Sequence, residues 1–279
     1  MNRRLLALLS TPLLLALAAC GGADTPRATP ATPPATGGPV PSVTPGADCL
    51  TPPERPGVVR FPSANGASIA GVVLGPAPTG GTPAGPTGGL GVVLAHQTSS
   101  DMCQWVPYGR TLVKRGYTVL AIDLNGYGAS SASAGNPSQA AYEADVVAAA
   151  GHLRGRGVGA VALVGASLGG MASVAAAAEL KPPPAAVVDL SGPAQMAGTD
   201  AAAAAPKVTA PLLFVVCADD QLAGDVTAVA KAATGAATSR LEVLPGTGSH
   251  GVALLDPTQE ARAAQVTKMI EDFLAEHAG

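Results

Sequence analysis

The stretch LVGASLGG, residues 163–170, decides how this sequence is interpreted. It places Ser167 between Gly165 and Gly169, directly after an apolar run and directly before a pattern typical of a helix. In this G-x-S-x-G context the chain turns sharply from a strand into a helix and exposes the serine hydroxyl at the turn. The turn strains the serine backbone and crowds its neighbours, which favours glycine on both sides. A chain with 35 glycines also produces such a motif by chance, so the surrounding sequence has to support it.

Apolar runs and helical patterns alternate along most of the chain. Many of the later runs are continuous and rich in β-branched residues, as in parallel strands that are buried on both faces. This alternation predicts an α/β fold, a doubly wound and mostly parallel sheet of about eight strands with helices on both faces. The expected strands are 58–61, 69–74, 91–96, 118–123, 158–165, 185–190, 211–217 and 241–244. The expected helices are 104–114, 137–153, 167–180, 222–234 and 257–277.

An acidic residue and a histidine follow the last two expected strands. Asp220 comes shortly after the first of them, and His250 comes shortly after the second. The working groups of a parallel sheet collect at the carboxyl ends of its strands, where Ser167 also lies. Asp219 competes with Asp220, one as the acid of the site and the other as a cap for the next helix. Asp189, near the end of another expected strand, is a remoter candidate for the acid.

These residue types suggest one chemistry. A serine hydroxyl is a poor nucleophile at neutral pH and needs a base within hydrogen-bond reach. His250 would take the proton of Ser167 and later donate it to the leaving group, while Asp220 would hold the histidine tautomer. The alternative is that Ser167 is an ordinary helix N-cap. Because serine, acid and histidine follow one another in this order, each on a carboxyl-end loop, we expect a Ser-His-Asp triad.

From Val58 to the C-terminus the sequence resembles the α/β-hydrolase family. Members place a His-Gly pair after the third strand, where this chain has His96-Gln97. They often carry an Asp-x-x-Gly-x-Gly-x-Ser loop after the fourth strand, and residues 123–130, DLNGYGAS, match every fixed position. The resemblance implies that the backbone N–H groups of Gln97 and Leu168 form the oxyanion hole, with His96 in a structural role. It implies no metal and no cofactor.

The N-terminus reads as a targeting segment. A basic start at Arg3 and Arg4, a short apolar core and small residues up to Ala19 predict a secretory signal peptide over residues 1–19. The apolar core is too short for a permanent membrane span. The ending LAAC, residues 17–20, resembles a bacterial lipobox. That resemblance implies that Cys20 becomes the lipidated first residue of the mature protein, held on a membrane by acyl chains such as palmitate.

The remaining chain divides by composition. Residues 20–48 are rich in Pro, Thr and Ala, and they predict an extended tether that cannot bury enough surface to fold. A second Gly/Pro stretch at 75–89 is expected to be a surface loop within the domain. Residues 49–279 then form one α/β-hydrolase domain on the extracytoplasmic side of the cell envelope. The formal net charge of −3 and the absence of a basic run argue against nucleic acid as a partner.

Cysteine usage fits an exported protein. If Cys20 is acylated, Cys49, Cys103 and Cys217 remain in an oxidising compartment, and at least one of them has no partner within the chain. Cys49–Cys103 is the preferred disulfide, because it would pin the start of the domain, and the other pairings stay open. No His/Cys cluster has the spacing of a structural zinc site.

The expected activity is that of a carboxylesterase that acts on small esters through an acyl-enzyme intermediate. Only about twenty residues separate Ser191-Gly192-Pro193 from the strand at Pro211, which leaves room for a short Ala-rich helix near 199–205 but not for a cap domain. The open site resembles the compact dienelactone-hydrolase-like branch, whose nucleophile is typically cysteine. A thioesterase, an amidase and a haloperoxidase-like enzyme are alternatives on the same triad. A non-catalytic binding lipoprotein on this scaffold is the alternative from a different class.

Overall fold

A computed structural model of the chain describes residues 48–75, 89–136 and 139–278. They belong to one compact unit that runs from Val43 to Gly279. The expected signal peptide, Cys20, nearly all of the expected tether and residues 76–88 of the expected surface loop lie outside the described residues.

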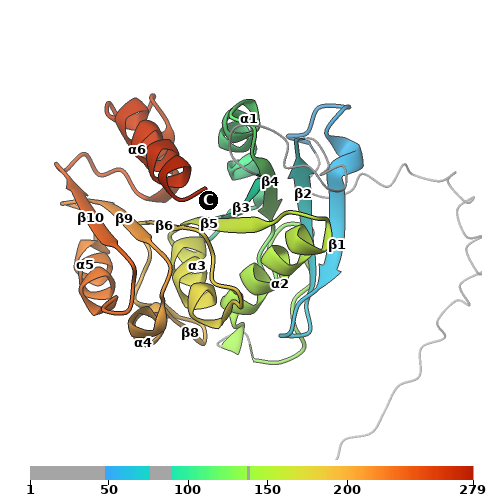
Figure 1. Cartoon of the computed structure of the whole chain (residues 1–279), viewed down its shortest axis with the longest axis horizontal. Coiled ribbons are helices and arrows are strands. Elements are labelled where there is room, and N and C mark those ends of the chain that lie inside the picture. Colours follow the sequence, from blue (N-terminus) through green and yellow to red (C-terminus); the bar gives the residue numbers. More distant parts are fainter. Residues whose placement is uncertain (1–47, 76–88, 137–138, 279) are drawn as a thin grey trace, which may run out of the picture. The chain divides into compact units, whose positions relative to one another are not determined.

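A single eight-stranded sheet runs through the centre of this unit (Figure 1). Its strand order is β1-β2-β4-β3-β5-β6-β9-β10. The first two pairings in this order, β1–β2 and β2–β4, are antiparallel, and the other five are parallel. The strands are β1 (Val58–Pro62), β2 (Ser68–Leu74), β3 (Leu90–Ala95), β4 (Thr118–Ile122), β5 (Ala160–Ala166), β6 (Val187–Leu190), β9 (Leu212–Cys217) and β10 (Ser239–Leu244).

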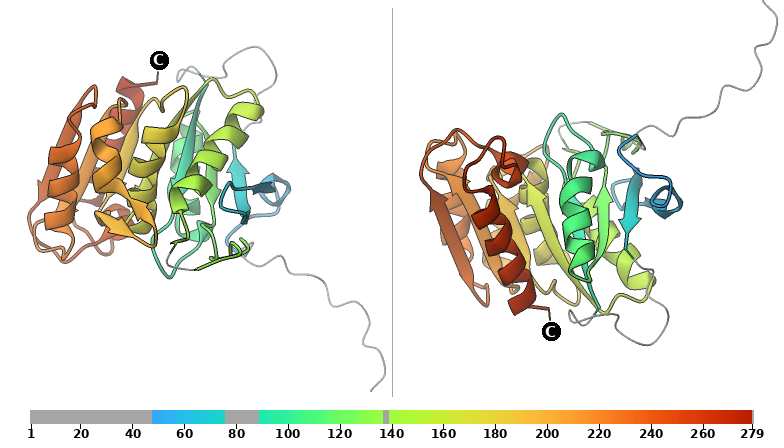
Figure 2. Two further views of the ribbon diagram at one scale, coloured as in Figure 1. Left: turned by 90° about the horizontal axis from the view of Figure 1, so that it is seen from below. Right: turned by 90° about the horizontal axis from the view of Figure 1, so that it is seen from above.

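Helices cover both faces of the sheet (Figure 2). One face carries α1 (Val106–Lys114) and α6 (Ala263–Glu276), and the other carries α2 (Tyr142–Gly155), α3 (Leu168–Glu179) and α5 (Ala223–Ala232). Because the sheet is covered on both sides, successive residues of a central strand enter different cores. In β3, Val93 packs with the cluster under α2 and α3, while Val92 and Leu94 pack with the cluster under α1 and α6.

The predicted α/β class and mostly parallel sheet are confirmed. All eight expected strands are present within two residues of their expected bounds. Two helix starts were predicted too early. α2 begins only at Tyr142, because Ala141 before it has a left-handed backbone with φ 50°. α6 begins only at Ala263, because the Asp256 carboxylate accepts the N–H of Thr258 and holds a local turn in place of a first helical turn.

The segment between β6 and β9 is short, as expected. It contains the two-residue strands β7 (Gln195–Met196) and β8 (Thr199–Asp200), which pair with each other, then α4 (Ala201–Ala204) and a 3-10 turn at Ala205–Lys207. The small hairpin was not predicted, because two residues per strand give no readable alternation. This segment is described throughout, and it holds no cap domain over the sheet edge.

The start of the domain is fastened covalently. The predicted Cys49–Cys103 disulfide is present and joins residues 54 positions apart. It ties the segment before β1 to the short 3-10 helix η2 (Met102–Gln104) that leads into α1. Cys217, at the end of β9, is free and buried. None of the helices in the described ranges is long and apolar enough to cross a membrane.

Candidate active site

Ser167 occupies the turn between β5 and α3. Its backbone has φ 49° and ψ −115°, a conformation that costs energy for a residue with a side chain. The turn is possible because its neighbours are glycines. A Cβ on Gly165 would lie 2.0 Å from the carbonyl oxygen of Gly169, and a Cβ on Gly169 would lie 2.1 Å from the carbonyl oxygen of Ala95. The G-x-S-x-G spacing is therefore a steric requirement of this turn.

Backbone hydrogen bonds hold the strained serine. Its N–H donates to the carbonyl oxygen of Leu190 at 2.7 Å, and its own carbonyl oxygen accepts the N–H of Met171 at 3.0 Å. The side chain makes no capping hydrogen bond to α3, which removes the reason to interpret Ser167 as an ordinary N-cap. The residue is 6% exposed at the carboxyl end of its strand.

Asp220 and His250 form a hydrogen-bonded pair. Asp220 Oδ2 lies 2.8 Å from His250 Nδ1, and Asp220 Oδ1 accepts the N–H of Leu222 at 2.9 Å. The Asp220 side chain is 1% exposed, whereas that of His250 is 32% exposed. A buried carboxylate therefore fixes one ring nitrogen of a histidine whose other face reaches solvent. This is the relation that orients a general base.

Asp219 and Asp189, the two other acids considered, have different surroundings. Asp219 accepts the N–H groups of Thr247 and Gly248 and so braces the loop that carries His250. Asp189 lies buried in β6, with Oδ1 so close to α3 that a Cβ on Gly170 would lie 2.1 Å from it. Burial raises the pKa of Asp189 to about 7, although the N–H of Gly192 opposes this.

His96 and Gln97 shape the loop after β3. The His96 ring is buried, and burial lowers its pKa. Nε2 accepts the N–H of Leu124 at 3.0 Å, so the neutral ring carries its proton on Nδ1, 2.7 Å from the Gln97 carbonyl oxygen. This fits the structural role expected for His96. The Gln97 side chain turns to the loop after His250, where Oε1 accepts the N–H of Val252 at 3.3 Å.

The spacing of Asp123, Gly126, Gly128 and Ser130 in the loop at 123–130 also has a physical basis in this structure. Asp123 is buried, and its carboxylate accepts the N–H of Met102 at 2.6 Å and the N–H of Ala129 at 2.7 Å. A Cβ on Gly128 would lie 2.4 Å from this carboxyl group. Burial raises the pKa of Asp123. The carboxyl thus ties the loop after β4 to the segment that leads into α1.

A buried network that the sequence did not indicate supports the histidine loop. The Glu260 carboxylate accepts the hydroxyl of Thr247, and it accepts the backbone N–H and Nε–H of Arg262 at 2.9 and 3.1 Å. These hydrogen bonds lower the pKa of Glu260 to about 2. Arg262 also donates to the Pro245 carbonyl oxygen at 2.8 Å. Glu260 lies in a stretch that resembled a surface helix, so no local signal set it apart.

The structure brings part of the expected site into direct contact. Asp220 and His250 are hydrogen bonded, and a Cβ built on Gly251 would lie 3.4 Å from Ala166 Cβ, next to Ser167. Within the described part of the chain, no hydrogen bond joins Ser167 Oγ to His250. Leu168, the first residue of α3, is buried beside the serine. No group of three His, Cys, Asp or Glu side chains in the described ranges could hold a metal ion.

Comparisons with known proteins agree with this architecture. A family model described as "Serine aminopeptidase, S33" matches residues 90–198, the part that carries Gln97 and Ser167 and ends before Asp220. An esterase of Pyrococcus furiosus has a similar structure, with a TM-score of 0.64, 15% identity, and coverage of 80% of this chain and 91% of that chain. The enol-lactonase of Burkholderia xenovorans gives a TM-score of 0.60 at 17% identity, with 77% of this chain and 99% of that chain covered.

A thermophilic esterase of Thermogutta terrifontis gives a TM-score of 0.58 at 17% identity, covering 80% of this chain and 99% of that chain. No curated protein matches this sequence significantly. At these identities the structural similarities establish the fold. The strand order, the serine turn between β5 and α3, and these neighbours together show that the chain has the α/β-hydrolase fold.

Proposed function

We propose that this protein is a serine hydrolase, and specifically a carboxylesterase with a Ser167–His250–Asp220 triad. One observation carries the proposal: a buried Asp220 holds His250 by a 2.8 Å hydrogen bond at the sheet edge where Ser167 occupies a strained turn. Backbone strain of this kind is concentrated at functional sites, and a buried carboxylate paired with a histidine orients a general base.

The proposed reaction proceeds in two halves. His250 Nε2 removes the Ser167 proton as Oγ attacks the ester carbonyl carbon, and the carbonyl oxygen becomes an oxyanion. The N–H groups of Leu168 and Gln97 stabilise that oxyanion. The carbon–oxygen bond to the alcohol then breaks, and His250 gives the alcohol its proton. A water molecule, deprotonated by His250, attacks the acyl-enzyme, and the acid leaves as Ser167 regains its proton.

The substrate class follows from the access to the site. No cap domain lies over the sheet edge between β6 and β9, which supports an open site of the compact dienelactone-hydrolase-like kind. Two of the similar structures are esterases and one is an enol-lactonase, so small carboxylic esters fit the proposal. The His250 side chain is 32% exposed, so it can reach a bound ester without a lid opening.

Active-site labelling with a fluorophosphonate probe tests the proposed chemistry. Wild type, Ser167→Ala and His250→Ala are compared by intact mass, because only an activated serine reacts. We expect one adduct on wild type and none on Ser167→Ala, followed by turnover of an ester panel by wild type alone. If folded wild type takes no label, the triad is not assembled, and a binding lipoprotein becomes the better description.

We further propose that the protein is exported and anchored to a membrane by lipid on Cys20. The support is the sequence LAAC at 17–20, which follows a short apolar core with a basic start. The disulfide between Cys49 and Cys103 is consistent with an oxidising compartment. Cys20→Ser removes the thiol that would carry the lipid, so it should stop lipid attachment and release the protein from membranes. Unchanged membrane retention of Cys20→Ser would contradict the anchor.

A further inference from the structure

A groove opens beside the expected oxyanion loop. It lies between the start of α1 and the segment after His250, and its volume is about 410 Å³. Gln104 and Val252 line the end next to Gln97, while Tyr108 and Leu255 supply apolar surface. A volume of this order is typical of sites for small organic ligands.

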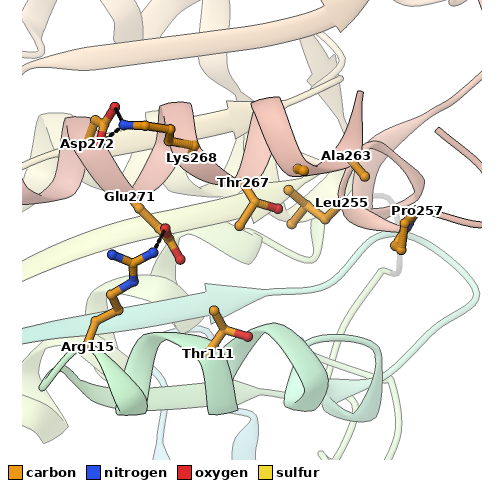
Figure 3. Close-up of a pocket in the computed structure, with 10 residues that line it drawn as sticks. Thr111, Arg115, Leu255, Pro257, Ala263, Thr267, Lys268, Glu271 and Asp272 are labelled. Carbon is orange, nitrogen blue, oxygen red and sulfur yellow. Dashed lines mark hydrogen bonds and ion pairs between the residues drawn. The ribbon is translucent and has the colours of Figure 1, made fainter. Parts of the chain in front are cut away.

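The groove continues between α1 and α6. A second hollow of about 470 Å³ shares Thr111, Leu255, Pro257 and Thr267 with the first. Figure 3 shows this part, with Thr111 on α1 facing Thr267 on α6. At the far end the guanidinium of Arg115 pairs with the carboxylate of Glu271 across the two helices. The path leads away from the oxyanion loop past uncharged residues such as Leu255 and Pro257, and it ends at two ion pairs, Arg115–Glu271 and Lys268–Asp272.

The entrance of this groove is in contact with the proposed reaction centre. Gln97 Oε1 accepts the N–H of Val252, and a Cβ on Gly251 would lie 2.5 Å from Gln97 Oε1 and 3.4 Å from Ala166 Cβ. Direct contacts thus link residues of the groove, the oxyanion loop and the serine turn. An ester bound with its carbonyl at Gln97 has this groove as its neighbour.

Gln104 belongs to the groove and also engages the oxyanion loop. Its side-chain oxygen Oε1 accepts the Gln97 N–H at 3.2 Å. An N–H group has a single hydrogen, so the donor expected to bind the oxyanion is occupied in the free protein. The Gln104 backbone is held by its neighbours, because Cys103 is in the disulfide and the Met102 N–H donates to Asp123. Only the Gln104 side chain has to move to free the amide.

We propose that the groove binds one unbranched apolar arm of the ester, and that this arm displaces the Gln104 side chain from the Gln97 N–H. Filling the groove and completing the oxyanion hole are then one event, which makes Gln104 a specificity-determining residue. The inference rests on the proposed function. It predicts a particular kinetic pattern. A longer arm raises kcat as well as lowering KM, because it frees the Gln97 N–H to bind the oxyanion in the transition state.

Chain-length profiles test this inference. One series varies the acyl arm in p-nitrophenyl esters from acetate to decanoate, and the other varies the alcohol arm in acetates from ethyl to octyl. For wild type we expect kcat to rise with length in one of the two series, which identifies the arm. Gln104→Ala frees the amide, so kcat on the shortest ester should rise roughly two- to tenfold, the worth of one hydrogen bond, and the profile should flatten.

Three further variants sharpen the test. Gln104→Glu holds the Gln97 N–H with a charge and should lower kcat on short esters. Thr267→Phe fills the channel and should shift the optimum to shorter arms. Gln265→Ala, an exposed glutamine of α6, is the matched control and should behave as wild type. A flat wild-type kcat in both series, or no gain in Gln104→Ala, overturns the inference while fluorophosphonate labelling of Ser167 still supports the proposed function. If Ser167 is not labelled, the proposed function and this inference are both refuted.

Discussion

A carboxyl group sealed beneath the serine turn predicts an unusual pH dependence of stability. Asp189 is buried in β6, and its Oδ1 has no hydrogen-bond partner in the described structure. Burial raises its pKa from 3.8 to about 7, so the folded protein holds this carboxyl protonated over a range in which the unfolded chain ionises it. Asp189→Asn replaces the acid by a neutral side chain of the same shape and removes the titration.

The magnitude follows from proton linkage. Between pH 4 and pH 7 the folded state binds one proton more than the unfolded state at Asp189, so raising the pH lowers the free energy of unfolding. With about 1.4 kcal/mol for each pH unit, the interval from 3.8 to about 7 corresponds to about 4 kcal/mol. The loss is complete above pH 7. It is a large part of the roughly 5 to 15 kcal/mol that stabilises a domain.

Urea unfolding at pH 4, 6 and 8 and constant ionic strength measures this effect. The stability of wild type relative to Asp189→Asn should fall by about 4 kcal/mol from pH 4 to pH 8. Asp48→Asn, at an exposed position, is the matched control and should follow wild type. A constant difference between wild type and Asp189→Asn would refute the reasoning, because it would mean that the buried carboxyl is already ionised. Fluorophosphonate labelling should persist in Asp189→Asn, since Asp220 pairs with the histidine.

Three other predictions concern the site and its supports. Asp220→Asn should lower kcat roughly ten-thousandfold with the fold intact, as the histidine loses the partner that fixes its tautomer; an unchanged kcat would exclude Asp220 as the acid. Glu260→Gln removes a carboxylate whose pKa the hydrogen bonds from Thr247 and Arg262 lower to about 2. Its stability deficit in thermal unfolding should be present at pH 7 and shrink as the pH falls below 4, and a deficit independent of pH would contradict this. Replacing both Cys49 and Cys103 by serine should cost about 4 kcal/mol in urea unfolding, given their 54-residue separation, and a loss below 1 kcal/mol would count against the loop-closure argument.

Most of the fold could be predicted because the strands are buried on both faces. A run such as LLFVVC at 212–217 is apolar throughout, so it can be recognised in the sequence as a buried strand. Helix starts were harder to predict, since they depend on one residue's backbone or side chain. The left-handed backbone of Ala141 and the turn held by Asp256 make α2 and α6 begin several residues later than the sequence pattern predicts. Neither effect changes the composition of the segment.

Some residues of the candidate site could likewise be predicted from the sequence, and others could not. Ser167, Asp220 and His250 could be proposed because each follows a strand that is readable in the sequence. The contacts of Gln104 and Glu260 could not, since the sequence around each residue does not show which distant group its side chain reaches. Gln104 reaches a backbone amide seven residues away, and Glu260 reaches Thr247 across a turn. Such hydrogen bonds depend on where two loops meet, and the path of a loop produces no periodic pattern in the sequence.

The disulfide at the start of the domain also determines where a mechanical load enters the fold. β1 is an edge strand that pairs with β2 alone, and edge strands peel by breaking one hydrogen bond after another. Tension on the chain before Cys49 does not reach β1 first, because the covalent bond passes it to Cys103. Buried Met102 and Trp105 anchor that point on either side. We therefore expect part of a pull from the N-terminus to bypass the sheet edge and to reach the segment that carries Gln104, beside the proposed site.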